Sequence, residues 1–376
     1  MPASSDAFDT ATILEGIRRW VEIETPTEAP EQVNKLMSIV AEQYRDLPVT
    51  LERIAGVEGC GDHVIARSEW GQDKPGILVL SHLDTVHPMG FIERLPFKVE
   101  GDSAFGPGIY DMKAGAYIAH HAFRVLCATG DRAPLGITHV FTSDEEIGSP
   151  TSRALIEKEG RNAKYVLVTE PARDGGKIVT GRKGVGRFEV FIKGVPAHAG
   201  SRPEDGRSAI RELANVIQTL EAMNDLKRGV TVNVGVVRGG TRPNVTPEEA
   251  YAEVDLRVPG VADADEFVGK ILGLTSKTDG VTVKVTGHLN RPPYEKGNAG
   301  ASLFEHAKTV AVEIGFELID MHTGGGSDGN FTAAYTATLD GLGADGKGAH
   351  THYEQIYVSS LEPRARLLHR LYQTLR

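Results

Sequence analysis

The acidic and imidazole side chains of this sequence gather in three short segments, and each segment directly follows an apolar run. The segments are SHLDT at 81–85, SDEE at 143–146 and TEP at 169–171. Carboxylates held this close repel one another unless a cation lies between them. One imidazole with several carboxylates suits Zn²⁺, Mn²⁺ or Co²⁺. The segments therefore predict a divalent-metal site that draws on His82, Glu145, Glu146 and Glu170.

The apolar runs before these segments predict how the segments meet. Residues 76–81, 136–142 and 165–168 are apolar runs too short for a helix, which is typical of buried strands. Helical spacing at 115–128 and 151–159 separates them, and this alternation predicts an α/β fold with a mostly parallel sheet. Ligands of such sheets bind at the C-terminal ends of the strands. We therefore expect the three segments to share one crevice.

Two spacings predict roles for individual side chains. Residues two apart in a strand share a face, so Asp84 can lie beside His82 and hold its ring. Glu145 and Glu146 are adjacent and point in different directions, so one can bind metal while the other acts as a base on water. Asp111, between glycines 108 and 115, adds a further carboxylate. Each feature alone is more often a surface or turn feature, and only their joint occurrence favours a metal site.

The rest of the chain predicts helices around a second, smaller sheet. Residues 11–44 predict two helices around a turn at 24–27. The middle of the chain predicts an α+β unit with an antiparallel sheet, with strands at 185–192, 230–237, 250–258 and 281–285 and helices at 206–223 and 264–274. Helices are expected again at 300–314 and 361–375. His120 and His121 fall on the predicted helix at 115–128 and are expected at the edge of the core or in solvent.

Composition excludes several classes of protein. The 376 residues carry a formal net charge of −10, which argues against a nucleic-acid binder. Two cysteines cannot make a disulfide framework or a thiolate zinc site. No apolar run approaches the ~20 residues of a membrane helix, and the N-terminus lacks a secretory signal pattern. We therefore expect a cytoplasmic protein that binds neither membrane nor nucleic acid.

The motifs in their order along the chain resemble those of the M20 family of co-catalytic metallopeptidases, in particular its glutamate carboxypeptidase (carboxypeptidase G)-like branch. The motifs are ETPT, SHLDTVHP, GPGIYDMKAG, TSDEEIGS, VTEP and GAHTHYE, and the resemblance covers essentially the whole chain. It implies two metal ions, usually zinc, with Co²⁺ or Mn²⁺ as alternatives.

The resemblance also implies roles for the residues of these motifs. Asp111 would bridge both metals, with His82 and Glu170 on one and Glu146 and His350 on the other. Glu145 would be the general base. Glutamate at position 170 goes with carboxypeptidases and deacylases, whereas many aminopeptidases have aspartate there. The family pattern AHTxxE selects His350 as the last ligand, with the nearby His352 as the alternative.

The middle segment contains motifs that resemble substrate-binding parts of the family. His198 in PAHAG resembles a lid histidine that steadies the developing oxyanion. Asn244 resembles a substrate-contacting asparagine. Arg257 resembles the arginine that pairs with the free carboxylate of the substrate, a task for which a guanidinium is suited by its bidentate geometry. Gly325, in a glycine-rich loop, resembles a residue that lines the substrate pocket through its backbone.

These motifs predict a discontinuous catalytic domain, 1–180 plus 292–376, interrupted by a lid and dimerisation domain at 181–291. We expect a homodimeric di-zinc amidohydrolase that cleaves an amide beside a free carboxylate. Its expected substrates are N-acyl or peptidyl amino acids ending in glutamate or a similar residue. Two alternatives stay open: a deacylase of the acetylornithine deacetylase or succinyl-diaminopimelate desuccinylase type, and a non-catalytic binding protein on the same fold.

Overall fold

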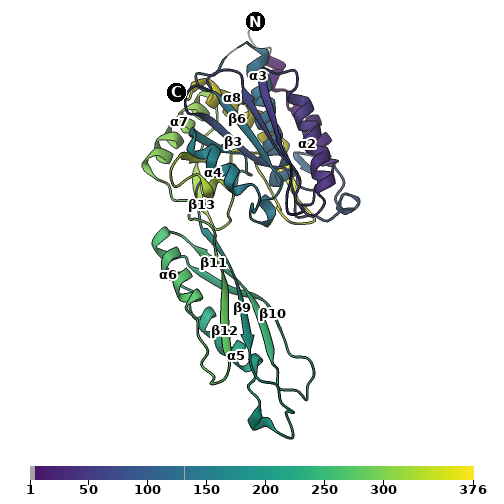
Figure 1. The fold of residues 1–376 in the computed structure, drawn as a ribbon. Helices are drawn as coiled ribbons and strands as arrows, with labels where there is room; N and C mark the ends of the chain where they lie inside the picture. Colours follow the sequence, from purple (N-terminus) through teal and green to yellow (C-terminus); the bar gives the residue numbers. More distant parts are fainter. Residues whose placement is uncertain (1–4, 131) are drawn as a thin grey trace. The chain divides into compact units, whose positions relative to one another are not determined.

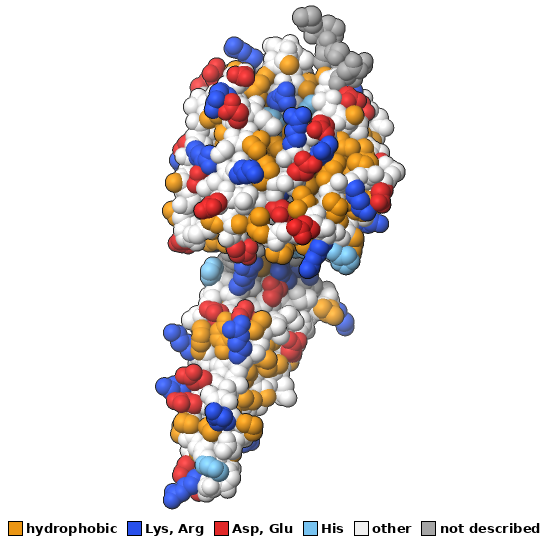
Figure 2. All heavy atoms as spheres, turned by 90° about the vertical axis from the view of Figure 1, so that its right-hand side faces the viewer, with side chains coloured by type: hydrophobic (Ala, Val, Ile, Leu, Met, Phe, Trp, Pro, Cys, Tyr) orange, Lys and Arg blue, Asp and Glu red, His pale blue; other side chains and the backbone are white. Residues whose placement is uncertain are grey.

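A computed structural model describes residues 5–130 and 132–376 of the chain. These residues form two compact units (Figure 1). The larger unit contains the described residues up to Gly181, together with Lys296–Thr323 and Ser327–Arg376. The smaller unit contains Arg182–Glu295 and the short return Gly324–Gly326. Acidic and basic side chains are interspersed on the face shown in Figure 2.

A six-stranded sheet forms the centre of the larger unit, in the order β1-β2-β6-β3-β7-β14. Its strands are β1 (Val49–Ile54), β2 (His63–Ser68), β3 (Gly76–His82), β6 (Ile137–Thr142), β7 (Ala163–Val168) and β14 (Ala337–Leu339). The four strands from β6 to β14 run parallel, and β2 and β1 extend the sheet in antiparallel fashion. The predicted mostly parallel sheet and its three central strands are confirmed.

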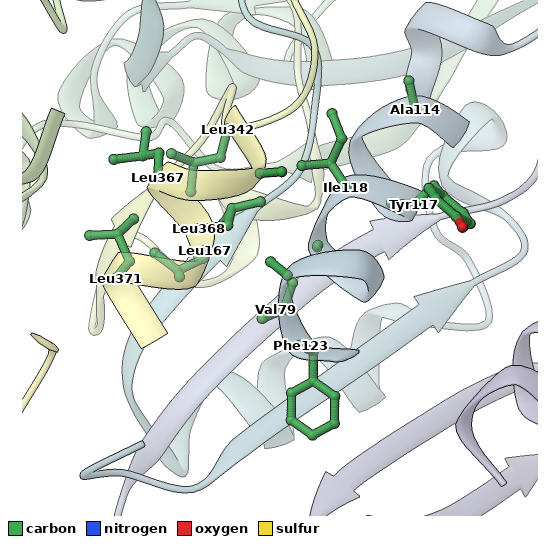
Figure 3. Packing of buried hydrophobic residues seen from close by; sticks show 14 of the residues in the cluster. Val79, Ala114, Tyr117, Ile118, Phe123, Leu167, Leu342, Leu367, Leu368 and Leu371 are labelled. Carbon is green, nitrogen blue, oxygen red and sulfur yellow. The ribbon is translucent and has the colours of Figure 1, made fainter. Parts of the chain in front are cut away.

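Helices cover both faces of this sheet. They are α1 (Thr10–Val21), α2 (Pro30–Tyr44), α3 (Ala114–Ala128), α4 (Arg153–Arg161), α7 (Asn298–Ile314) and α8 (Leu361–Thr374). On one face, Val79 of β3 and Leu167 of β7 pack in a large core with apolar side chains of α3 and α8 (Figure 3). On the other face, Leu78 and Leu80 pack with Ile156 of α4. Because alternate residues of β3 enter opposite cores, residues 77–80 of this strand are all apolar.

Helix α3 is buried almost all round, which corrects the expectation for its histidines. His120 is fully buried and His121 nearly so. Burial lowers the pKa of both rings below the usual value. The aromatic rings of Tyr44 and Tyr117 contact His120, so the helix packs its histidines inside the core.

Two smaller sheets of the larger unit consist of short strands. The sequence predicts short strands between the helices at 300–314 and 361–375, but not those at 98–105 and 178–182. β4 (Lys98–Glu100), β5 (Ser103–Phe105), β15 (Gly346–Lys347) and β16 (Gln355–Tyr357) form an antiparallel sheet in the order β15-β16-β5-β4, and β8 (Ile178–Arg182) pairs with β13 (Asp320–Thr323). The pairing of β16 with β5 matters for the site, since it ties the segment after His350 to the segment before Asp111.

The smaller unit is an antiparallel sheet with two helices packed on it, as predicted. Its strands are β9 (Gly184–Lys193), β10 (Thr231–Gly239), β11 (Glu249–Val258) and β12 (Thr282–Arg291), and its helices are α5 (Ala209–Glu221) and α6 (Val261–Leu272). Along β9 buried and exposed residues alternate, because one face meets the helices. β12 is longer than predicted, because its second half also pairs with β9 although it lacks a regular apolar alternation.

Short helical turns complete the chain. They are η1 (Ser5–Phe8), η2 (Phe91–Glu93), η3 (Ile109–Lys113), η4 (Glu145–Ile147), η5 (Pro203–Asp205), η6 (Asp328–Phe331) and η7 (Val358–Ser360). Among the described residues, no helix is long and apolar enough to cross a membrane.

Candidate metal centre

Three neighbouring parallel strands, β6, β3 and β7, end side by side and deliver the acidic segments to one edge of the sheet. His82 is the last residue of β3, Glu145 opens the turn η4 after β6, and Glu170 follows β7. The edge of the sheet therefore collects groups that are up to 88 residues apart in the sequence.

Asp111 lies at the centre of this cluster. Its Oδ1 is 3.2 Å from Nε2 of His82, and its Oδ2 is 3.4 Å from Nε2 of His350. Each histidine also faces a glutamate: His82 Nε2 is 3.6 Å from Glu170 Oε1, and His350 Nε2 is 3.2 Å from Glu146 Oε2. The arrangement is thus two half-sites, each with one histidine and one glutamate, that share the Asp111 carboxylate.

The donor set fits a cation. Oε1 of Glu146 is buried and has no hydrogen-bond partner among the described residues, so this acceptor is left for a ligand outside the chain. Burial raises the pKa of Glu146 to about 8, because a charged carboxylate is costly there. Ligand atoms of His82, Glu145 and Glu170, and of His82, Asp111 and Glu146, lie within 4.8 Å of one another.

The histidines and carboxylates of this cluster shift the pKa values of one another, which favours protonated His350 beside ionised Asp111. Hydrogen bonds to Asp111 and Glu146 raise the pKa of His350 to about 11. Although burial opposes its ionisation, Asp111 has a pKa well below the usual range because His350 and His82 contact it. A divalent ion would take the place of these protons, and its binding would release them.

Asp84 lies beside the ring of His82 and contacts its Nδ1. Nδ1 lies 3.0 Å from the backbone carbonyl oxygen of Asp84 and 3.5 Å from its carboxylate. When Nδ1–H donates to that carbonyl, Nε2 keeps its lone pair for a metal. The structure thus places Asp84 beside the His82 ring, and the backbone carbonyl is the closer of its two contacts with Nδ1.

The Asp84 carboxylate also orders the glutamate pair. It is fully buried and accepts hydrogen bonds from the backbone N–H groups of Glu145 (3.2 Å) and Glu146 (3.1 Å). The Thr27 hydroxyl donates a third hydrogen bond, at 2.8 Å. The turn that carries Thr27 lies beside the chain after β3, where Thr25 donates to the Leu83 carbonyl. This contact explains why an ETPT turn near the start of the chain belongs to the site.

The structure separates the two candidate histidines of the last motif. His350 reaches Asp111 and Glu146, and its backbone has a φ of 63°, a left-handed conformation that is uncommon outside glycine. The described contact of His352 is an edge-on ring contact with Tyr353. Such backbone outliers are found where the surrounding structure requires them, often at ligand sites. The geometry brings His350, and not His352, to the cluster.

Four other predicted site residues lie in the smaller unit. The exposed His198 accepts hydrogen bonds at Nδ1 from the N–H groups of Gly200 and Ser201, so its neutral ring carries the proton on Nε2. Asn244 is beside it, since its carbonyl accepts from the N–H of Ala199. The structure thus brings His198 and Asn244 together.

Arg257 and Gly325 lie at the other end of this unit. Nε and Nη2 of Arg257 donate to the two carboxylate oxygens of Asp255, at 2.8 and 2.9 Å. Arg182 Nη1 donates to the carbonyl of Gly325 at 3.2 Å. Arg257 pairs with Val185 at the start of β9, and His198 comes after the end of β9.

The sequence reading missed Glu354 and His87, whose side chains contact each other at 2.7 Å between Oε2 and Nε2. His87 had no identifiable partner in the sequence, because Glu354 is 267 residues away. The one available signal was the glutamate that ends the GAHTHYE motif.

Comparison with known proteins places this cluster in a family. The signature of "Peptidase family M20/M25/M40" matches residues 78–374. The chain belongs to this family. It is 31% identical over 375 residues to carboxypeptidase G2 of Pseudomonas sp. (strain RS-16), covering 97% of this chain and 88% of that protein. As a member of the M20 family, the protein is a metal-dependent hydrolase.

Solved structures share the fold. Aminopeptidase PepT of Bacillus cereus superposes with a TM-score of 0.78 at 24% identity, covering 98% of this chain and 99% of that chain. The M20 family metallo-carboxypeptidase Sso-CP2 of Sulfolobus solfataricus gives a TM-score of 0.74 at 17% identity, covering 96% and 98%. At these identities the comparisons support the mixed α/β fold and not a substrate.

Proposed function

We propose that this protein is a two-metal carboxypeptidase that hydrolyses the amide bond next to a free carboxylate, releasing C-terminal glutamate or a similar residue from N-acyl or peptidyl substrates. The observation that carries the proposal is the position of Asp111, with one carboxylate oxygen toward each histidine. The similarity to carboxypeptidase G2 over nearly the whole chain supports the choice of reaction.

In this proposal His82 and Glu170 would hold one ion, Glu146 and His350 would hold the other, and Asp111 would be shared by both. Zinc is the first choice, with Co²⁺ or Mn²⁺ as alternatives. Two such ions supply polarisation of the scissile carbonyl and a water of lowered pKa. Glu145 takes a proton from the attacking water and passes it to the leaving amine. Asp84 keeps Glu145 in place through the backbone hydrogen bond described above.

Arg257 binds the free carboxylate of the substrate in this proposal. Asp255 accepts hydrogen bonds from Nε and Nη2 of the guanidinium, which leaves Nη1 to bind the substrate. The backbone of Gly325 lines the same pocket, and Asn244 and His198 contact the reacting amide.

The smaller unit supports a homodimer in which His198 serves the site of the other chain. Val185, which pairs with Arg257, lies eight residues before Lys193 on β9. At the rise of a strand these eight residues span about 26 Å. His198 pairs with Val245 beyond that far end. A dipeptide-sized substrate cannot bridge this distance, so Arg257 and His198 of one chain do not serve the same site.

Mixing two inactive variants tests the contribution in trans. After subunit exchange between Glu145→Ala and His198→Ala, roughly a quarter of the sites should regain both groups if His198 acts on the partner. Exchange verified by mass spectrometry without recovered activity would show that His198 does not act in trans.

A substrate panel tests the function itself. The metal-free protein is reconstituted with Zn²⁺, Co²⁺ or Mn²⁺ and assayed on N-acyl amino acids, on peptides ending in glutamate, and on the matching C-terminal amides. Turnover of the glutamate acids supports the proposal. Turnover confined to N-acetyl or N-succinyl diamino acids would identify a deacylase instead, and binding without turnover by any metal form would identify a binding protein.

A further inference from the structure

Glu354 is a fully buried carboxylate that connects three metal-bearing segments of the larger unit. It follows His350 by four residues. It also contacts the loop that carries Asp111 and, through His87, the segment that follows His82 at the end of β3. Glu354 is in neither of the two groups of described residues whose ligand atoms lie close enough together to hold a metal ion.

Four hydrogen bonds reach this carboxylate. Oε1 accepts from the backbone N–H groups of Tyr110 (2.8 Å) and Asp111 (2.9 Å). Oε2 accepts from the backbone N–H of Gly108 (2.9 Å) and from Nε2 of His87 (2.7 Å). A carboxylate has about four lone-pair positions, so Glu354 has no capacity left for a metal. Any effect of Glu354 on a metal must therefore be exerted through the groups to which it is hydrogen-bonded.

The loop that Glu354 holds has an irregular backbone. Gly108 has a φ of 67°, and Asp111 has a φ of −115° and a ψ of 93°, far from helical values although the segment η3 surrounds it. The loop cannot satisfy its N–H groups through regular helical bonds, and it is buried. Glu354 supplies the missing acceptor for three of these groups, and so fixes the peptide planes from which the Asp111 side chain projects.

His87 supports the same carboxylate from the other side. It is 6% exposed, and its ring stacks on Phe91 at a centroid distance of 4.3 Å and an interplanar angle of 8°. The stacked ring presents Nε2 to Glu354 in one direction. The position of the chain after His82 is therefore linked to the position of the Asp111 loop.

We propose that Glu354, held by His87, is a positioning residue that sets the orientation of the Asp111 carboxylate between the two metal positions. The inference rests on the two-metal site proposed above. It assigns to the last residue of the GAHTHYE motif a task that differs from ligation: Glu354 acts on metal affinity through the Asp111 backbone, not through a bond to the metal.

Metal titration of Glu354→Gln tests this role. The amide keeps one acceptor but places an NH₂ group against N–H donors, so the loop loses its fixed geometry. We expect the affinity of the metal-free variant for Co²⁺ to fall about 10–100-fold by calorimetry, with altered visible absorption bands of bound Co²⁺. Hydrogen exchange at the amides of Tyr110 and Asp111 should become faster than in the wild type, without any metal present.

A matched control separates this role from general stability. Glu212 in the smaller unit is also fully buried and accepts from the N–H of Lys277 and the hydroxyl of Thr278. Glu212→Gln should lower the melting temperature and leave Co²⁺ affinity and spectrum at wild-type values. Glu354→Asp restores the charge at a shorter reach, so we expect it to recover part of the Co²⁺ affinity.

The outcomes distinguish this inference from the proposed function. If the wild type binds no second metal ion, the two-metal proposal fails. If the wild type binds two ions and a folded Glu354→Gln binds both with unchanged affinity and spectrum, the positioning role is overturned. If Glu354→Gln does not fold, the same titration is made on His87→Phe, which keeps the stacking on Phe91 and removes one donor; unchanged affinity there overturns the role as well.

Discussion

Asp84→Asn is the substitution whose effect can be worked out most fully from the structure. The Asp84 carboxylate is fully buried and accepts three hydrogen bonds, from the Thr27 hydroxyl and the backbone N–H groups of Glu145 and Glu146. Asparagine has the same shape, but one of its two terminal groups is a donor. That NH₂ group must face at least one N–H or O–H donor, whichever way the amide is turned.

The expected cost follows from that mismatch. Loss of one hydrogen bond to a charged group costs about 1.5–3 kcal/mol in the free energy of unfolding. The second effect is on the metal, because the Asp84 carboxylate accepts from the backbone N–H of Glu146 and lies 3.5 Å from Nδ1 of His82. Loss of such a supporting group typically reduces metal affinity or activity by about 10–100-fold.

Urea unfolding of the metal-free protein and calorimetric titration with Zn²⁺ measure the two effects separately. Thr27→Val is the matched control: it removes one of the three donors and leaves the carboxylate and both N–H contacts in place. Thr27→Val should lose less unfolding free energy than Asp84→Asn, and its Zn²⁺ affinity should stay close to that of the wild type. An Asp84→Asn protein with wild-type stability and wild-type affinity would refute the reasoning.

Three further predictions concern the base, the substrate and the core. Glu145→Gln should keep its metal by elemental analysis while turnover falls by ~10²-fold or more, because an amide is no base at neutral pH; loss of metal would make Glu145 a ligand. Arg257→Ala should weaken substrates with a free α-carboxylate by about 10–150-fold, the equivalent of 1.5–3 kcal/mol, and spare their amides in kcat/KM measurements; equal losses on both would remove it from this role. Burial lowers the pKa of His139 to about 3, so below pH ~6.5 the unfolded chain takes up a proton that the folded chain does not. Stability is fully present above that pH and should fall by about 1.4 kcal/mol per pH unit for this histidine as the pH drops toward 3. Urea unfolding from pH 7 to 4 should show a shallower decline in His139→Gln, and an unchanged slope would contradict the assignment.

The sequence predicts those parts of the fold that have a regular pattern. β3 and β7 contain continuous apolar runs, at 77–80 and 165–168, because both faces of the sheet are covered, and β9 alternates because only one face is. Strands of two or three residues such as β15 and β16 have no period to detect. β15 pairs with the nearby β16, but β16 pairs with β5, about 250 residues away, and this second pairing brings the segment after His350 to the segment before Asp111.

The residues of the site likewise fall into those that the sequence predicts and those that it does not. The positions of His82, Glu145 and Glu170 at neighbouring strand ends follow from the parallel sheet alone. The sequence predicts Asp111 as a further carboxylate, and the family resemblance gives it the bridging role; His350 is singled out by the resemblance alone. The carbonyl contact of Asp84 and the bonds of Glu354 depend on backbone geometry, which no side-chain pattern encodes.

The central claim is that one carboxylate, that of Asp111, serves two metal ions. Calorimetric titration of the metal-free protein with Zn²⁺, checked by elemental analysis after gel filtration, counts the ions directly. The account predicts two ions per chain in the wild type and the loss of at least one in Asp111→Asn, whose amide cannot offer a carboxylate oxygen to both half-sites. One ion per chain in the saturated wild type, or two tightly bound ions in Asp111→Asn, would contradict it.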